Sequence, residues 1–339
     1  MFKCTSMDVT EKLLSEAGLR DLPQTLGELG GRALQSALLD AYDIRAAALD
    51  PADVLRQYET SDLTEPCTLD QREIIRFENF VVDTIPEQFN FVELSPVTAL
   101  GSNSVLASVS QKNVLGTTRN TEVVADGVTV LTLEAAKRQR SVSHESTAMH
   151  LGTLHRETRT QQHEHPGFTS HFHALSLISN ERTSQPDDFK GRSFAEHTSA
   201  YLDVIKGASA VGYEARGISV ALSNIRVLEL IMKNQGLDKD AIMRRTQTPG
   251  FDAFRECNIA LPSHIEPEEL PTLLASLQPE LSYLARTLAY TGRIFEPTIE
   301  SIRTVYGSEV HTYFDLSRHA GIGYYQDAAV KISAETPRG

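Results

Sequence analysis

Two arginines and their polar neighbours are the residues of this chain that could bind phosphate. Arg156 precedes Glu157, and Arg159 stands two positions before Gln161, all near the end of a strand predicted to begin at Met149. Arginine suits phosphate because its planar guanidinium can hold two oxygens at once. The alternative is that both arginines are ordinary surface residues of a strand.

Histidines offer a second kind of chemistry. Most of the chain's histidines lie in one short region, and those that could converge are His163 and His165 in a loop and His171 and His173 on one face of the next strand. Four imidazoles could bind zinc or a similar metal. Their spacing matches no metalloenzyme signature such as H-E-x-x-H, and they could also hydrogen-bond a nucleotide or face water, so no metal site is predicted. The rest of the group is His144, His150 and His155.

Strands must position these side chains. Alternating apolar residues predict a strand over 149–161 and a returning strand over 169–179. Asp126-Gly127 is a strong two-residue hairpin signal, which predicts a further strand over 128–133. Other strands are expected at 89–94, 213–222 and 310–316. An antiparallel sheet with helices to one side is an α+β fold.

Helices are expected before these strands and between them in the sequence. Residues 1–69 read as a helical N-terminal extension, in which Pro23 opens an amphipathic segment to Leu49 and Asp50-Pro51 starts another helix. A helix over 70–85 leads into the first strand. Residues 70–339 are predicted to form one catalytic-type domain, and 224–306 a mainly helical insertion within it.

Composition limits the functions. The net charge of −13 provides little general hold on a nucleic-acid backbone, so tRNA is not an expected ligand. Cys4, Cys67 and Cys257 have neither disulfide-framework nor metal-site spacing. No apolar run approaches the length of a membrane span, and no secretory signal is evident, so a soluble protein of the reducing cytoplasm is expected.

Residues 315–325, Asp-Leu-Ser-Arg-His-Ala-Gly-Ile-Gly-Tyr-Tyr, resemble a segment of histidyl-tRNA synthetases and their relatives, which reads roughly D-L-S-x-x-R-G-x-x-Y-Y-T-G-x-x-F. In that family the segment lines the amino-acid pocket. The resemblance implies that Tyr324 and Tyr325 close over an amino acid. Gln326 and Asp327 stand where the family has Thr-Gly.

The arginine region resembles motif 2 of class II aminoacyl-tRNA synthetases. The resemblance implies that Arg159 holds the ATP α-phosphate, that Gln161 replaces the glutamate that reads adenine, and that Phe172 stacks on the base. Arg156 with Glu157 is the reserve assignment, because it keeps the charges but loses the spacing.

Two further residue groups carry weaker resemblances. The helix to residue 85, the strand to Leu94 and Pro96 resemble motif 1, which builds the family's homodimer interface. Glu134 falls where relatives carry residues that face the amino-acid ammonium. It could equally be an acidic residue in the first turn of a helix over 135–140.

The resemblance implies a class II synthetase-like protein that binds an amino acid and ATP, with Mg²⁺, and forms an aminoacyl adenylate. Nothing after Val330 matches the family's motif 3, so a complete tRNA synthetase is not expected. The alternative is a non-catalytic paralogue that senses an amino acid or regulates a partner enzyme, as the regulatory subunit of ATP phosphoribosyltransferase does.

Overall fold

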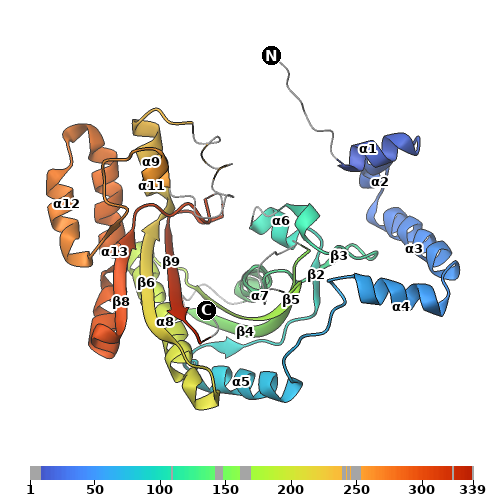
Figure 1. Cartoon of the computed structure of the whole chain (residues 1–339), viewed down its shortest axis with the longest axis horizontal. Helices are drawn as coiled ribbons and strands as arrows, with labels where there is room; N and C mark the ends of the chain where they lie inside the picture. The colour runs from blue at the N-terminus through green and yellow to red at the C-terminus, as the bar shows by residue number, and fades with distance from the viewer. Residues whose placement is uncertain are drawn as a thin grey trace.

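The computed structural model describes residues 9–107, 110–141, 148–160, 169–238, 242, 245, 253–322 and 324–337. Its N-terminal part is helical, as expected, and the helices lie to one side of the rest of the molecule (Figure 1). The segment from Pro23 to Leu49 forms two helices rather than one, because the chain is extended at Leu29 and Gly30. The four helices are α1 (Val9–Glu16), α2 (Leu22–Glu28), α3 (Gly31–Ala47) and α4 (Pro51–Thr60).

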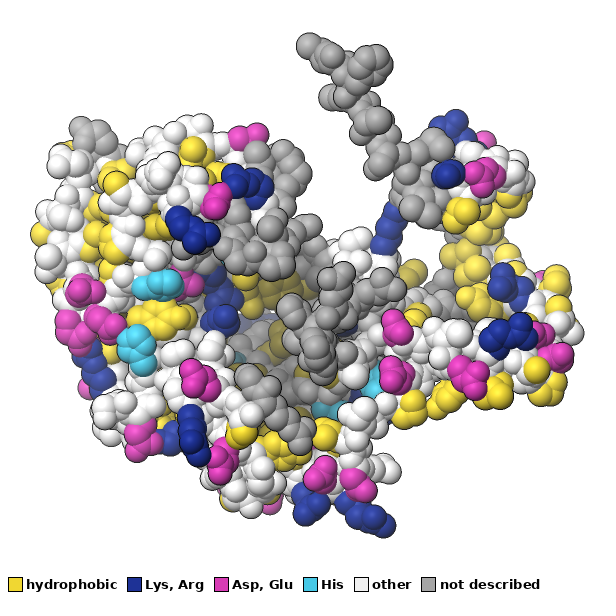
Figure 2. Space-filling view, viewed as in Figure 1, with side chains coloured by type: hydrophobic (Ala, Val, Ile, Leu, Met, Phe, Trp, Pro, Cys, Tyr) yellow, Lys and Arg dark blue, Asp and Glu magenta, His cyan; other side chains and the backbone are white. Residues whose placement is uncertain are grey.

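Helix α4 begins as the sequence predicts. The Asp50 side chain accepts a hydrogen bond from the Asp53 amide at 2.8 Å, and Asp53 returns the contact to the Asp50 amide at 3.2 Å. Helices α2 to α4 nevertheless contain no buried residue. Exposed apolar side chains therefore run along these helices, as Figure 2 shows. Tyr42 and Ile44 of α3 are both exposed.

The first sheet has the strand order β1-β4-β5. Strands β4 and β5 are the antiparallel pair that the alternating pattern predicts, with Glu157 opposite Phe172 and Arg156 opposite His173. Strand β1 is parallel to β4 and much shorter than the predicted strand over 89–94. The strands are β1 (Asn90–Phe91), β4 (Met149–Thr158) and β5 (His171–Asn180).

Helices cover both faces of this sheet. On one face, α5 (Gln71–Thr84) and α8 (Pro186–Gly207) pack against Leu177 and Phe89. On the other, α7 (Gly127–Ser141) packs against Leu151. Asp70 caps α5 by accepting a hydrogen bond from the Arg72 amide at 2.7 Å.

The strand predicted over 128–133 is wrong, because this segment lies within α7. Asp126 starts the helix instead of a hairpin, since its side chain accepts a hydrogen bond from the Val128 amide at 2.9 Å. Leu131 and Ala135, one turn apart, are both buried against the sheet. Helical spacing of apolar residues therefore prevails over the local Asp-Gly turn preference.

A short hairpin leads into α7. Strands β2 and β3 are antiparallel, and the buried carboxylate of Glu122 in β3 accepts hydrogen bonds from Gly101, Asn103 and Gln111 at 2.8–3.0 Å. Burial would raise the pKa of Glu122, but these hydrogen bonds outweigh it and hold the pKa below its ordinary value. The elements here are β2 (Val97–Ala99), α6 (Ser102–Leu106) and β3 (Thr121–Val123).

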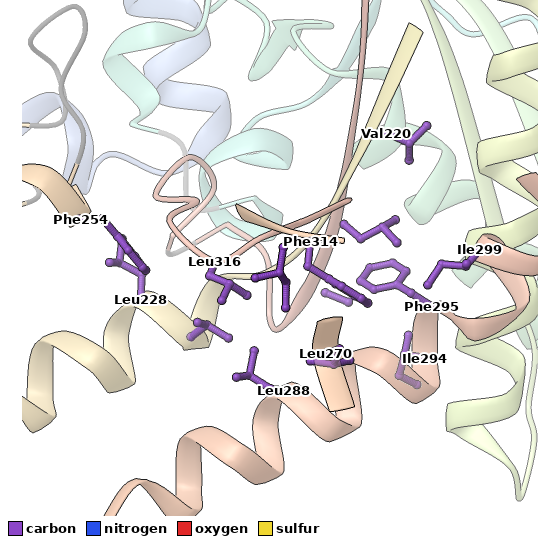
Figure 3. Close-up of a cluster of buried hydrophobic side chains, with 14 of the residues drawn as sticks. Val220, Leu228, Phe254, Leu270, Leu288, Ile294, Phe295, Ile299, Phe314 and Leu316 are labelled. Carbon is purple, nitrogen blue, oxygen red and sulfur yellow. The ribbon is translucent and has the colours of Figure 1, made fainter. Parts of the chain in front are cut away.

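The second sheet has the order β7-β8-β6-β9. Strand β6 is parallel to β8 and antiparallel to β9. The side of this sheet that faces the helices forms the largest core, with Phe314 and Phe295 at its centre (Figure 3). The strands are β6 (Arg216–Asn224), β7 (His264–Ile265), β8 (Val310–Asp315) and β9 (Ala328–Glu335); the helices are α9 (Ile225–Asn234), α11 (Ala253–Glu256), α12 (Leu270–Ser276) and α13 (Ser282–Tyr306).

The molecule therefore mixes helices and strands as expected, but the predicted sheet arrangement is wrong. The strands over 151–160 and 310–316 belong to different sheets, and each sheet contains a parallel pair. The described part of 224–306 is mainly helical, although it includes β7. Within it, α13 runs without a break from Ser282 to Tyr306, although Pro297 lies inside the helix. The division into residues 1–69 and 70–339 stays a prediction.

Candidate functional site

A carboxylate and a tyrosine from distant parts of the chain meet at the start of α7. The Tyr324 hydroxyl donates a hydrogen bond to Oδ2 of Asp126 at 2.9 Å. Burial and the neighbouring Asp126 raise the pKa of Tyr324, so its hydroxyl stays protonated and can donate. The Tyr325 ring packs edge-on against Tyr324, with 4.9 Å between ring centroids.

Glu157 supplies a second carboxylate beside Asp126. It is buried, and its Oε1 accepts a hydrogen bond from the Gly127 amide at 2.7 Å. Burial is the main cause that raises the pKa of Glu157, and the charge of Asp126 adds to it; the Gly127 amide and Arg159 act in the opposite direction without cancelling the rise. Two acidic groups thus lie where a cation would relieve their repulsion.

Arg159 borders these carboxylates. Its Nε donates to the Ala125 carbonyl at 3.1 Å, and one terminal nitrogen lies 3.4 Å from Oε2 of Glu157. The guanidinium stands over the Phe172 ring at 5.0 Å from the centroid. Its side chain remains 43% exposed, which leaves it accessible to an anion. A cation over an aromatic ring is a suitable platform for a nucleotide.

The register of β4 separates the two candidate arginines. Glu157 points to the face on which α7 packs, and Arg156, the adjacent residue, points to the opposite face with His173 across the strand pair. The chain pairing continues beyond β4, since the Arg159 amide donates to the Ser170 carbonyl. Arg159 therefore shares a face with Glu157 and Phe172, whereas Arg156 does not.

Glu134 is not brought to this group. It lies inside α7, seven residues after Gly127, a distance of about 10 Å along a helix. Its carboxylate pairs with Arg138 at 2.9 Å and Lys137 at 3.3 Å, and the Arg138 hydrogen bond is the main cause that lowers the pKa of Glu134. The reading of Glu134 as a helix residue agrees with this placement, although the helix begins earlier than residue 135.

Asp126 is the residue that the sequence reading missed. The chain brings it to the end of β4 because the Thr158 amide donates to the Val124 carbonyl at 3.0 Å. Its sequence signal was the Asp126-Gly127 pair, which indicated a hairpin. Gly127 itself is needed here, since a Cβ would lie 2.8 Å from the Ser176 hydroxyl. The same pair thus marks both a helix start and a site carboxylate.

The loop that carries the tyrosines is fixed at its far end. Lys190 of α8 donates to the Asp327 carboxylate at 2.8 Å, and the Ile225 amide donates to the Asp327 carbonyl at 3.0 Å. Gly321 has a φ of 91°, and a Cβ there would meet the Tyr325 ring at 2.2 Å. Asp327, one of the residues that depart from the family sequence, therefore anchors the loop.

The histidines do not gather around a metal in the part of the chain that is described. His173 pairs with Glu78, and Nε2 of His171 lies 2.6 Å from the Glu65 carbonyl. Among the described residues, no three His, Cys, Asp or Glu side chains are placed to hold a metal ion. His144, His163 and His165 lie outside the described residues, as does Gln161.

Comparison with solved structures identifies the fold. The chain resembles an ATP phosphoribosyltransferase regulatory subunit/histidyl-tRNA synthetase from Bacillus halodurans, with 15% identity and a TM-score of 0.57 over 80% of this chain and 71% of that one. It also resembles a histidine-tRNA ligase subunit from Alicyclobacillus acidocaldarius, at 13% identity and a TM-score of 0.56 over 80% of this chain and 83% of that one. A histidyl-tRNA synthetase from Nostoc gives 12% identity and a TM-score of 0.52, with 79% and 63% covered.

These matches confirm, at the level of the fold, the resemblance that residues 315–325 indicate. No protein-family model matches the sequence, and no curated protein matches it.

Among the described residues, no helix combines the length and the apolar character that crossing a membrane requires. Cys67 and Cys257 are both free thiols.

Proposed function

We propose that this protein binds an amino acid and ATP at the start of α7, in the manner of a class II synthetase-like protein. The observation that carries the proposal is the hydrogen bond between Tyr324 and Asp126 beside the buried Glu157 and the half-exposed Arg159. An amino acid carries an ammonium and a carboxylate side by side. The two carboxylates complement the ammonium, and the guanidinium beside them is available to a phosphate of ATP.

In this proposal Asp126 and Glu157 bind the ammonium. Each carboxylate has lone pairs to spare, since Asp126 receives bonds from Tyr324 and the Val128 amide, and Glu157 from the Gly127 amide and Arg159. A bound cation would also favour the ionised form of Glu157, whose pKa is raised by burial. Tyr324 fixes the orientation of Asp126, which prepares the site for the ligand.

Arg159 and Phe172 form the proposed nucleotide subsite. The guanidinium would contact the α-phosphate, and the ring would support the base. Because the described residues contain no ready-made metal site, Mg²⁺ is expected to arrive with the ATP phosphates, which it commonly bridges. Mg²⁺ would supply charge neutralisation at those phosphates.

Adenylation needs no nucleophile from the protein. The amino-acid carboxylate oxygen would form a bond to the α-phosphorus while the bond to pyrophosphate breaks, and pyrophosphate leaves with the electron pair. Arg159 would stabilise the negative charge that spreads over the phosphoryl oxygens. The carboxylates of Asp126 and Glu157 would hold the amino acid in line for this attack.

The second candidate is a regulatory or sensing role without turnover. It is supported by the B. halodurans structure, whose name includes a regulatory subunit, and by the contacts that already occupy part of Arg159. In this role the same pocket would bind an amino acid, and this binding would regulate the activity of a partner enzyme. The net charge of −13 gives little electrostatic support for tRNA as a ligand in either role.

Exchange of radiolabelled pyrophosphate into ATP, measured for each of the twenty amino acids, tests the proposal. Exchange that depends on one amino acid supports adenylation. Amino-acid binding by calorimetry without exchange supports the sensing role. The absence of both activities in a folded protein would contradict the proposed site.

A further inference from the structure

A cavity adjoins the proposed site on the side of Tyr325. It lies between α8 and β9 and has a volume of about 540 Å³. Phe194 and Ile205 of α8 form one wall, and Val330 and Ile332 of β9 form another. This volume falls within the range of about 300 to 1,000 Å³ that small-molecule sites occupy. The cavity is therefore large enough for a bulky side chain.

One chain of contacts links this cavity to the carboxylates. Tyr325, which lines the cavity, packs against Tyr324, whose hydroxyl is bonded to Asp126. Tyr201 of α8 also lines it, and burial raises the pKa of Tyr201 to about 12, with further contributions from the charges of Asp126 and Glu157. Through Tyr325 and Tyr324, the cavity and the proposed ammonium site are neighbours.

Two polar side chains of the cavity already have partners. Nε2 of His197 lies 2.8 Å from the Ser179 hydroxyl, and the Tyr201 hydroxyl donates to the Leu175 carbonyl at 3.1 Å. Burial lowers the pKa of His197 to about 4, so it is neutral at pH 7. None of the described residues that line the cavity is Asp, Glu, Lys or Arg. The wall thus presents mainly hydrocarbon and aromatic surface.

We infer that this cavity takes the side chain of a large hydrocarbon amino acid, such as phenylalanine or leucine, whose ammonium lies at Asp126 and Glu157. The inference rests on the proposed function and names its substrate class. A charged side chain would lose its hydration in the cavity without gaining a counter-ion. An imidazole would lose hydrogen bonds to water that the occupied His197 and Tyr201 do not replace.

Isothermal titration calorimetry on the full chain at pH 7 tests the inference with phenylalanine, leucine, histidine, alanine, aspartate and lysine. We expect phenylalanine or leucine to bind at least 10-fold more tightly than the other four. Tightest binding of histidine, alanine or a charged amino acid would overturn the inference and leave the proposed function standing. No binding of any amino acid would overturn both.

Filling the cavity gives a second readout. Val330→Trp should weaken phenylalanine or leucine binding at least 10-fold and change alanine binding less than 3-fold, because the ammonium site is untouched. Ser333→Trp is the matched control, since Ser333 is an exposed residue of the same strand. Ile205→Trp fills the cavity from the α8 side. It serves as the test variant if thermal unfolding shows that Val330→Trp is misfolded. Unchanged phenylalanine and leucine affinity in a folded cavity variant would overturn the inference.

Discussion

The hydroxyl of Tyr324 lies 2.9 Å from Oδ2 of Asp126, although 198 residues separate the two in the sequence. The contact joins the start of α7 to the loop before β9, and so brings the tyrosine pair to the carboxylates. Because Asp126 also caps α7 through the Val128 amide, one side chain both starts a helix and orients a tyrosine.

Removing the Tyr324 hydroxyl should weaken amino-acid binding. Tyr324→Phe is expected to reduce the affinity about 3- to 10-fold, because one hydrogen bond of roughly 0.5–1.5 kcal/mol is lost. Asp126→Asn should cost more, since it removes a charge opposite the ammonium. Calorimetry measures both affinities. Tyr283→Phe, at an exposed position in α13, is the control that should have no effect. Equal losses in all three variants would contradict the assignment.

Arg159→Ala should weaken ATP binding by about 1.5–3 kcal/mol if its guanidinium makes a charge-assisted contact with phosphate. Arg156→Ala is the matched control, because Arg156 is exposed on the opposite face of the same strand. Equilibrium binding of a fluorescent ATP analogue measures both variants. A loss in Arg156→Ala with none in Arg159→Ala would transfer the role to Arg156; unchanged affinity in both would remove the nucleotide subsite.

Glu157 should make amino-acid affinity depend on pH. Its pKa is raised above the ordinary value of 4.5, so the carboxylate ionises only at higher pH, and affinity for an ammonium should increase as pH rises through that window. Glu157→Gln keeps an oxygen for the Gly127 amide but removes the charge, and should flatten the profile. Calorimetry between pH 4.5 and 8 gives the comparison. Parallel profiles in the two proteins would show that another group titrates.

The same shift predicts a stability effect of definite sign. The folded protein binds the Glu157 proton more tightly than the unfolded chain does, so folding stability falls as pH rises from 4.5 through the raised pKa. Glu157→Gln removes the group that titrates. Between pH 4.5 and pH 7, the melting temperature of the variant should therefore fall less than that of the unmodified chain. Thermal unfolding at the two pH values measures it. A larger fall with pH in the variant would contradict the burial argument.

Self-association through α5 is expected from the motif 1 resemblance. Ile75 and Val82 are exposed and lie two turns apart on this helix, so they share a face that a second copy could cover. Light scattering at micromolar concentration should show a homodimer, and Ile75→Lys should shift it to a monomer. Val105→Lys, which changes an exposed apolar residue of α6, is the control. A monomeric unmodified chain would remove the prediction.

The sequence by itself determined the local elements whose signals are short-range. Asp50 and Asp70 cap helices where the residue types require it, and the alternating pattern around residues 149–179 gives the paired strands β4 and β5. Capping and strand alternation depend on neighbours in the chain, so they can be read from the order of residues. The segment at 315–325 likewise indicated the fold that the solved structures share.

Only the tertiary structure decided which side chains meet. Residues 128–133 form a helix because burial of Leu131 against the sheet outweighs the turn preference of Asp126-Gly127. Arg159 rather than Arg156 joins Glu157, because the packing of α7 determines which face of β4 the site occupies. Asp126 and Tyr324 become partners through contacts between distant segments. Such pairings depend on how elements pack in three dimensions, and no local pattern in the sequence specifies them.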